Sequence, residues 1–308
     1  MSIIRKMRNP SAPRESGVFM RLLRRLIINL VALVGLIAIA IVVGYVYVRK
    51  TYNIDLFNTV SQLKTLSKEV DQKELCMFPI KDSDYSDAKT EIDKSIVDFV
   101  TYEEGTGYNG YTVNLSKSDL RLNKFMMISS QQLGALAQII LHQQTGGKIS
   151  VSGKEVAIKI LELEIYQVQD DGSADLNIIL ELDLTPLFDN TKKFPFNFLK
   201  KYAPKKLYIS STVTIQKGET AFSYSVLHKD ITINNLKSSD TADFFNTLDF
   251  VFKIGSAEDL NLLIGNTVAN ALIGNEANPG FAYTLKQYGA KDFSFATRAA
   301  TNFFIVRK

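Results

Sequence analysis

The chain has 308 residues, of which 46% are hydrophobic, 22% charged and 10% aromatic, a composition that excludes a disordered chain or a collagen-like fibre. Its single cysteine, Cys76, excludes an internal disulfide and is too few for a structural zinc site. The formal net charge is +4, but residues 1–25 hold seven Lys and Arg and one acid, a net of +6 that leaves −2 for the rest. Because the basic excess lies on a short leader, the charge pattern argues against nucleic-acid binding.

Residues 26–48 form the longest apolar segment, with 23 residues, no charge and one polar amide, Asn29. This length is enough to cross a hydrocarbon core of about 30 Å as a helix. Positive charge concentrates before the segment, so we expect residues 1–25 to be a cytoplasmic tail, 26–48 a single transmembrane helix, and the remainder an extracytoplasmic domain at the cell membrane. One alternative is a cleaved signal peptide, with Ala38-Ile39-Ala40 as a small-x-small site, and another is the reverse orientation.

Residues 49–75 are predicted to be a stalk helix, because Leu56, Val60, Leu63 and Val70 recur at helical spacing. This helix either docks on the domain or pairs with a second copy of the chain, which would make a homodimer. Residues 76–86 read as a connector, and a helix is expected from about Ser86. The extracytoplasmic domain is then 76–308, with subdivision near residues 110 and 238 as an open alternative.

The rest of the pattern predicts an α+β domain in which an antiparallel amphipathic sheet packs with several helices. Ser129 with Gln132, and Ser256 with Asp259, have the spacing of helix-starting capping boxes. Period-two alternation predicts strands over 156–168, with a bulge at 160/161, and over 174–184, joined by a turn at 170–172. Further strands are expected over 207–215 and 222–226, near 231–233 and within 281–308, with a helix from about Ser239.

Catalytic chemistry has little support in the sequence, and we expect a protein that is not an enzyme and uses no cofactor or metal. The two histidines, His142 and His228, lie in no recognisable nucleophile or metal motif. Asp170, Asp171 and Asp175 lack calcium-loop spacing and favour a hairpin turn. Four acids of the strands have outward phase and are expected to form a solvated face, with paired-carboxylate chemistry as the alternative: Glu162, Glu164, Glu181 and Asp183.

The segment 190–207 interleaves lysines with aromatic residues between two prolines. Lysines facing anionic headgroups and aromatic rings at the interface are what peripheral membrane contact requires, and an anionic wall polymer would suit the same chemistry. The alternative is a connecting helix whose aromatic side chains enter the core and whose lysines are solvated. The candidate contact residues are Lys192, Lys193, Phe194, Phe196, Phe198, Lys200, Lys201, Tyr202, Lys205 and Lys206.

A short N-terminal anchor, the helix SSQQLGALAQIIL (129–141) and the strand segment DDGSADLNIILELDLTPL (170–187) together resemble uncharacterised single-pass envelope proteins of Gram-positive bacteria. The exported domain of those proteins is similar to tubular lipid-binding folds. The resemblance implies a strongly twisted sheet that wraps a helix and leaves an apolar groove, and it brings no catalytic residue. The long Lys/Phe connection and the helical region 239–275 depart from that pattern.

Two functions are therefore expected from different classes. The first is a membrane-anchored, non-enzymatic envelope protein that binds a lipid or lipid-linked component in an apolar groove. The second is a scaffold or accessory subunit that recruits a protein partner at the outer face of the cytoplasmic membrane. The candidate groove residues are the apolar face of strand 174–184: Leu176, Ile178, Leu180, Leu182 and Leu184.

Overall fold

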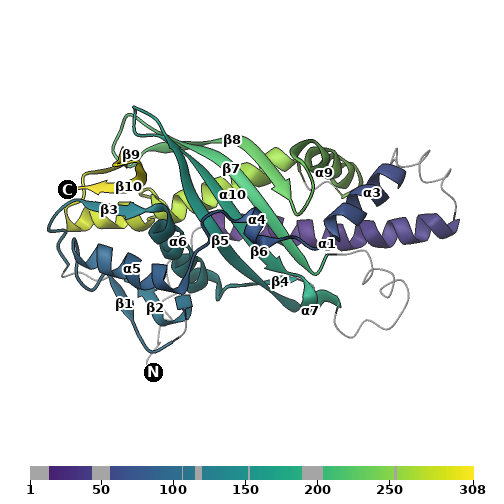
Figure 1. The fold of residues 1–308 in the computed structure, drawn as a ribbon, viewed down its shortest axis with the longest axis horizontal. Coiled ribbons are helices and arrows are strands. Elements are labelled where there is room, and N and C mark those ends of the chain that lie inside the picture. The colour runs from purple at the N-terminus through teal and green to yellow at the C-terminus, as the bar shows by residue number, and fades with distance from the viewer. Residues whose placement is uncertain are drawn as a thin grey trace, which may run out of the picture.

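A computed structural model describes residues 14–43, 56–105, 107–114, 120–151, 153–188, 204–252 and 255–308. Its centre is a five-stranded antiparallel sheet in the order β4-β5-β6-β7-β8 (Figure 1). A three-stranded sheet, β3-β10-β9, and a hairpin, β1-β2, lie at one end of the molecule, and helices pack around all three. The predicted α+β class with antiparallel sheets is confirmed.

The strands of the central sheet are β4 (Lys148–Val151), β5 (Lys154–Val168), β6 (Ala174–Asp183), β7 (Lys206–Lys217) and β8 (Tyr224–Ile233). The other strands are β1 (Val100–Tyr102), β2 (Tyr111–Val113), β3 (Met126–Ser129), β9 (Asp292–Arg298) and β10 (Thr301–Arg307). The longer helices are α1 (Arg14–Val43), α3 (Leu56–Leu66), α5 (Asp82–Asp93), α6 (Ser130–Thr145), α9 (Ser238–Phe252) and α10 (Ala257–Leu272). The short ones are α4 (Gln72–Leu75), α7 (Thr185–Phe188), α11 (Phe281–Thr284) and the 3-10 turns η1 (Gly107–Gly110) and η2 (Leu285–Tyr288).

The central sheet is a meander whose strands follow one another along the chain. The β5-β6 turn forms where predicted, because Gly172 adopts a φ of +86° and the Asp171 carboxylate accepts a hydrogen bond from the backbone N–H of Ser173. One expectation for strands is wrong, because the segments expected at 222–226 and 231–233 are one strand, β8. The strands expected within 281–308 are β9 and β10, which begin at Asp292, after α11 and η2.

Each irregularity of the central sheet is tied to a helix by a side chain. At the predicted β5 bulge, the N–H of Ile160 donates to Gln138 of α6 at 2.6 Å. Near a second irregularity of β5, the N–H of Ile165 donates to Ser130 of α6 at 3.0 Å. Opposite the β8 irregularity, the carbonyl of Thr212 accepts from Asn261 of α10 at 2.9 Å. Backbone groups that a bulge leaves without a strand partner are thus satisfied, and the two helices are fixed on one face of the sheet.

Helices α6 and α10 begin at the predicted capping boxes, with Ser129 and Ser256 as their N-caps. They cover the face of the sheet that carries the apolar side chains, α6 over β5 and α10 over β7 and β8. Helix α5 begins at Asp82, four residues before the predicted start, because the Asp84 carboxylate accepts from the N–H of Lys81 and closes a capping arrangement there.

The N-terminal helix α1 lies against β4, α10, α9 and α3 (Figure 1). Six of its apolar side chains are at most 2% exposed. Residues 44–48 of the predicted transmembrane segment lie outside the described residues. Among the helices that the structure describes, none meets both the length and the apolar character needed to cross a bilayer.

In place of one stalk helix over 49–75, the described residues form α3 and α4, separated by a non-helical stretch at 67–71. Helix α3 packs on α9 and α1, and Leu63 and Leu66 are buried. The amide of Asn234 donates to the carbonyl of Leu66 at 2.7 Å, which fastens the end of α3 to the sheet. Helix α3 is therefore docked on the domain in this structure.

Candidate functional site

An apolar cleft lies between α6 and α10 above the central sheet. Its floor is β5 and β6, and its free volume is about 30 Å³, so it is nearly closed. The polar lining residue Thr267 donates its hydroxyl to the carbonyl of Leu263 in its own helix, and the other polar residue, Gln144, lies at the exposed rim. The cleft therefore presents almost only hydrocarbon. Its lining residues are Ala137, Leu141, Gln144, Ile158, Ile160, Leu180, Ile264, Thr267, Val268 and Ala271.

The five candidate groove residues of β6 lie on the inner face of the sheet, as their alternation predicts. All are at most 3% exposed, and only Leu180 reaches the cleft. The other four are packed in the core: Leu176, Ile178, Leu182 and Leu184. In this structure the apolar face of β6 is thus covered, and the only part of it that faces the cleft is Leu180.

The apolar stripe of α1 is a second feature of the same side of the molecule. Its six buried side chains recur every three or four residues, the spacing of one helix face. Helix α1 contacts β4, whose buried side chains are Ile149 and Val151. We call the surface on which α1 lies, formed by α10, β4 and α9, the bed of α1. Helix α10 borders both the cleft and this bed, and the β4-β5 hairpin contributes β5 to the cleft and β4 to the bed. The stripe is Leu23, Leu26, Ile27, Leu30, Leu33 and Val34.

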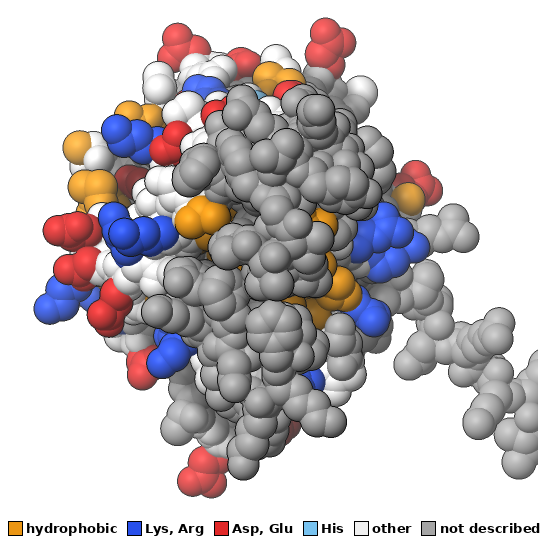
Figure 2. All heavy atoms as spheres, turned by 90° about the vertical axis from the view of Figure 1, so that its right-hand side faces the viewer, with side chains coloured by type: hydrophobic (Ala, Val, Ile, Leu, Met, Phe, Trp, Pro, Cys, Tyr) orange, Lys and Arg blue, Asp and Glu red, His pale blue; other side chains and the backbone are white. Residues whose placement is uncertain are grey.

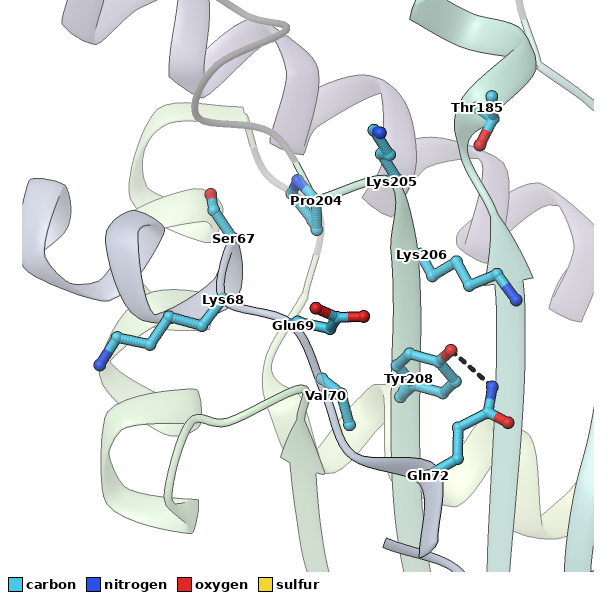
Figure 3. Close-up of a pocket in the computed structure, with 10 residues that line it drawn as sticks. All are labelled: Ser67, Lys68, Glu69, Val70, Gln72, Thr185, Pro204, Lys205, Lys206 and Tyr208. Carbon is cyan, nitrogen blue, oxygen red and sulfur yellow. Dashed lines mark hydrogen bonds between the residues drawn. The ribbon is translucent and has the colours of Figure 1, made fainter.

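A larger, polar cavity of about 650 Å³ opens near the end of α3 (Figure 3). One wall is formed by residues 67–70 and Gln72, and the other by Thr185, residues 204–206 and Tyr208. Figure 3 shows the Glu69 carboxylate directed into the cavity and the Lys68 side chain directed away from it. The hydroxyl of Tyr208 accepts from the Gln72 amide at 2.7 Å, which joins the two walls.

Two candidate membrane-contact residues, Lys205 and Lys206, line this polar cavity. Lys206 is paired with Glu181 at 3.0 Å. Partial burial lowers the pKa of Lys206, but the hydrogen bond and charge of Glu181 outweigh it, so the pKa is raised and the ammonium stays charged. Lys206 is paired with Glu181, Lys68 is directed away from the cavity and the Glu69 carboxylate is directed into it. The cavity is therefore not a strongly basic pocket. The remaining candidates, from Lys192 to Tyr202, lie outside the described residues.

The opposite face of the sheet holds a buried acid that the sequence pattern placed in solvent. Glu162 is 1% exposed, because the connector over residues 76–80 crosses β5 and the N–H of Phe78 donates to the carboxylate at 2.7 Å. Burial raises the pKa of Glu162. The expectation of a solvated face is therefore wrong at this position.

Cys76, in the same connector, has a protonated thiol at neutral pH. Burial, and then the charges of Glu162 and Glu181, raise its pKa to about 11. A thiol is a weak nucleophile until it ionises. Cys76 therefore has the properties of a core residue.

Each of the two histidines packs against, or contacts, a neighbouring side chain. His142 packs edge-on against Tyr108, with ring centroids 5.0 Å apart. The Asn261 amide lies between His228 and Ser211, 2.6 Å from the His228 Nδ1 and accepting from the Ser211 hydroxyl at 2.5 Å. An amide does not take a proton from a hydroxyl, so this chain of contacts does not activate Ser211. Within the described ranges, no group of three or more His, Cys, Asp or Glu is placed to hold a metal ion.

The residues that hold the cleft together, Gln138 and Asn261, were not singled out in the sequence. Both are fully buried polar side chains within otherwise apolar helix faces. An amide residue on the apolar face of a predicted helix is the sequence signal that would have identified them, because a buried amide needs a hydrogen-bond partner on a neighbouring element. The Nε2 of Gln138 has no hydrogen-bond partner among the residues that the structure describes.

Comparison with protein-family models, with curated proteins and with solved structures gives no match for this chain. Function is therefore inferred from the residues and their geometry alone. The features that we consider first are the apolar cleft and the adjoining bed of α1, because both are lined mainly by aliphatic side chains.

Proposed function

We propose that the protein is a membrane-anchored, non-enzymatic envelope protein that binds lipid hydrocarbon in the cleft between α6 and α10. The observation that carries the proposal is the lining of the cleft, eight of whose ten side chains are aliphatic. Apolar pockets of this kind bind ligands by burying hydrocarbon, without hydrogen bonds that select a headgroup. Opening the cleft requires α6 and α10 to separate, and the half-buried Leu141, Thr267 and Ala271 lie at its mouth.

The anchor in this proposal is the segment 26–48, and the domain lies outside the cell membrane with the basic tail 1–25 in the cytoplasm. Support comes from the charge asymmetry and from the charge-free length of the segment. On the end of the molecule near α3 and α9, lysine, arginine and hydrophobic side chains lie among acidic ones (Figure 2). Contact between this end and anionic headgroups would bring the cleft to its ligand.

The test uses a photoreactive palmitic acid that carries a diazirine, added to the full chain in mild detergent. We expect cross-links to map to α6 and α10, within residues 137–144 and 264–271. Ala271→Phe places a ring at the mouth of the cleft and should lower this labelling about fivefold or more. Ala242→Phe makes the same exchange at an exposed site on α9 and should leave the labelling unchanged. Equal labelling of the two variants would refute the cleft as the site.

The second candidate function is a scaffold that recruits a protein partner. It is favoured by Met77 and Phe78, two neighbouring hydrophobic side chains of the connector that are 75% and 44% exposed. Exposed apolar side chains that adjoin one another are typical of protein contact surfaces. The scaffold predicts that the palmitic acid probe labels neither α6 nor α10, which separates it from the lipid-binding proposal.

A further inference from the structure

We propose that the polar cavity near the end of α3 is a second binding site, which takes a small zwitterion with an ammonium group at one end and a phosphate at the other. The simplest ligand of this class is the phosphoethanolamine group, either free or as the headgroup of a lipid. The cavity volume of about 650 Å³ lies within the range of small-molecule sites. The cavity and the cleft share no lining residue, so this inference does not rest on lipid binding in the cleft.

The first observation is that the two walls of the cavity each present one charge, and that these charges are of opposite sign. Glu69 belongs to the wall that follows α3, and its carboxylate is directed into the cavity (Figure 3). Lys205 belongs to the opposite wall, next to the start of β7. Among the residues that the structure describes, neither of these two side chains has an ion-pair or hydrogen-bond partner.

This arrangement of charge selects the class of ligand. An acid alone would favour a cation and a lysine alone an anion, whereas one of each on facing walls is complementary to a molecule that carries both charges. Lys206 adds no second positive charge, because it is paired with Glu181 at 3.0 Å.

The separation of the two charges narrows the class further. Glu69 and Lys205 do not pair with each other, so a ligand that meets both needs its own charges several bonds apart. Phosphoethanolamine has this spacing, whereas an α-amino acid carries both charges on one carbon. A lysine ammonium binds phosphate well as a point charge, which fits the phosphate end of the ligand to Lys205 and the ammonium end to Glu69.

The second observation is that a buried asparagine holds the two walls in place. Asn234 is 9% exposed, and its amide donates to the carbonyl of Leu66 at 2.7 Å and to the carbonyl of Lys206 at 3.2 Å. Its Oδ1 accepts from the N–H of Tyr208 at 2.7 Å. Its φ of +49° is uncommon for a residue other than glycine, and such positions cluster at binding sites. Asn234 therefore sets the separation of the walls.

The backbone that carries the acid is fixed by the next residue. The Asn235 amide donates to the carbonyls of Lys68 and Glu69, at 3.2 Å and 3.4 Å. The main chain at Glu69 is thus tied to the sheet, while the carboxylate itself is left for a ligand. Groups that are positioned in advance lose less conformational freedom on binding, which favours a specific site.

The experiment measures binding of phosphoethanolamine to the full chain in mild non-ionic detergent, by saturation-transfer NMR. Two fragments are compared with it: ethyl phosphate, which lacks the ammonium, and ethanolamine, which lacks the phosphate. We expect phosphoethanolamine to bind with a Kd below about 1 mM. Each fragment should bind at least about tenfold more weakly, because it loses one charge-assisted contact.

Two variants assign the ends of the ligand to the walls. Glu69→Gln should abolish the preference for phosphoethanolamine over ethyl phosphate, and Lys205→Met should abolish the preference over ethanolamine. Lys68→Met is the matched control, because the Lys68 side chain is directed away from the cavity, and it should keep both preferences within about twofold. Each preference is a ratio measured within one variant, so a general loss of stability does not imitate the result.

A second arm distinguishes the lipid headgroup from the free group. Phosphoethanolamine is titrated into the full chain in vesicles of phosphatidylglycerol, with and without phosphatidylethanolamine. A weaker apparent affinity beside phosphatidylethanolamine would show that its headgroup competes for the cavity, and an equal affinity would assign the site to the free group; both results support the zwitterion site. Binding of either fragment to the wild type as tightly as phosphoethanolamine, or binding of none of the three, would overturn it.

Discussion

Asn261→Ala tests whether the tie between α10 and the sheet holds the wall of the cleft. Asn261 is fully buried, accepts from the Ser211 hydroxyl at 2.5 Å and donates to the Thr212 carbonyl at 2.9 Å. Alanine leaves both of these groups without their partner, and each buried unpaired group costs about 1–3 kcal/mol. The better helix propensity of alanine returns about 0.5 kcal/mol. The expected loss of unfolding free energy is therefore about 1.5–5.5 kcal/mol.

The assay is urea unfolding of the full chain in mild detergent, followed by far-ultraviolet circular dichroism. Asn266→Ala is the matched control, because the Asn266 amide donates only within α10, to the carbonyl of Leu262 at 2.8 Å. The control should stay within about 0.5 kcal/mol of the wild type. If Asn261→Ala costs no more than this control, the hydrogen bonds of Asn261 do not hold α10, and the reasoning from the bulge is refuted.

Three further predictions concern buried or strained groups. Burial raises the pKa of Glu162, so the folded state binds a proton more tightly than the unfolded state, and stability falls as pH rises from about 4.5. Glu162→Gln should raise the thermal midpoint at pH 7 and flatten this pH dependence; an unchanged profile would contradict it. The native Cys76 thiol, with its pKa near 11, should react with iodoacetamide at pH 8 about 100-fold more slowly than in urea, and a difference under threefold would contradict its burial. Gly172→Ala should lower the free energy of unfolding in urea by about 1–2 kcal/mol, because φ is +86° at this residue. Gly153→Ala is the control, since Gly153 has a similar φ of +78° but open space around it. Its loss measures the contribution of backbone strain alone.

Local signals in the sequence predicted much of the fold. The capping boxes at Ser129 and Ser256 involve residues three apart, so their geometry is decided within one turn. The change of phase near residue 160 predicted the β5 bulge, because a bulge moves every later side chain to the other face. The meander followed from strands that alternate in period two, of which β5 and β6, and β7 and β8, are separated by short turns, whereas β6 and β7 are joined by the longer segment 184–205.

Other features depend on partners that are distant in the chain. Glu162 has outward phase, but the connector that buries it comes from 84 residues earlier, at Phe78. The break in the alternation between residues 226 and 231 suggested that one strand ends and another begins. It is instead an irregularity within the single strand β8, and the hydrogen bond from Asn261 to the Thr212 carbonyl stabilises it. In α1 the part of the docking stripe from Leu26 to Val34 is hidden from pattern analysis, because the residues between its members, apart from Asn29, are also apolar.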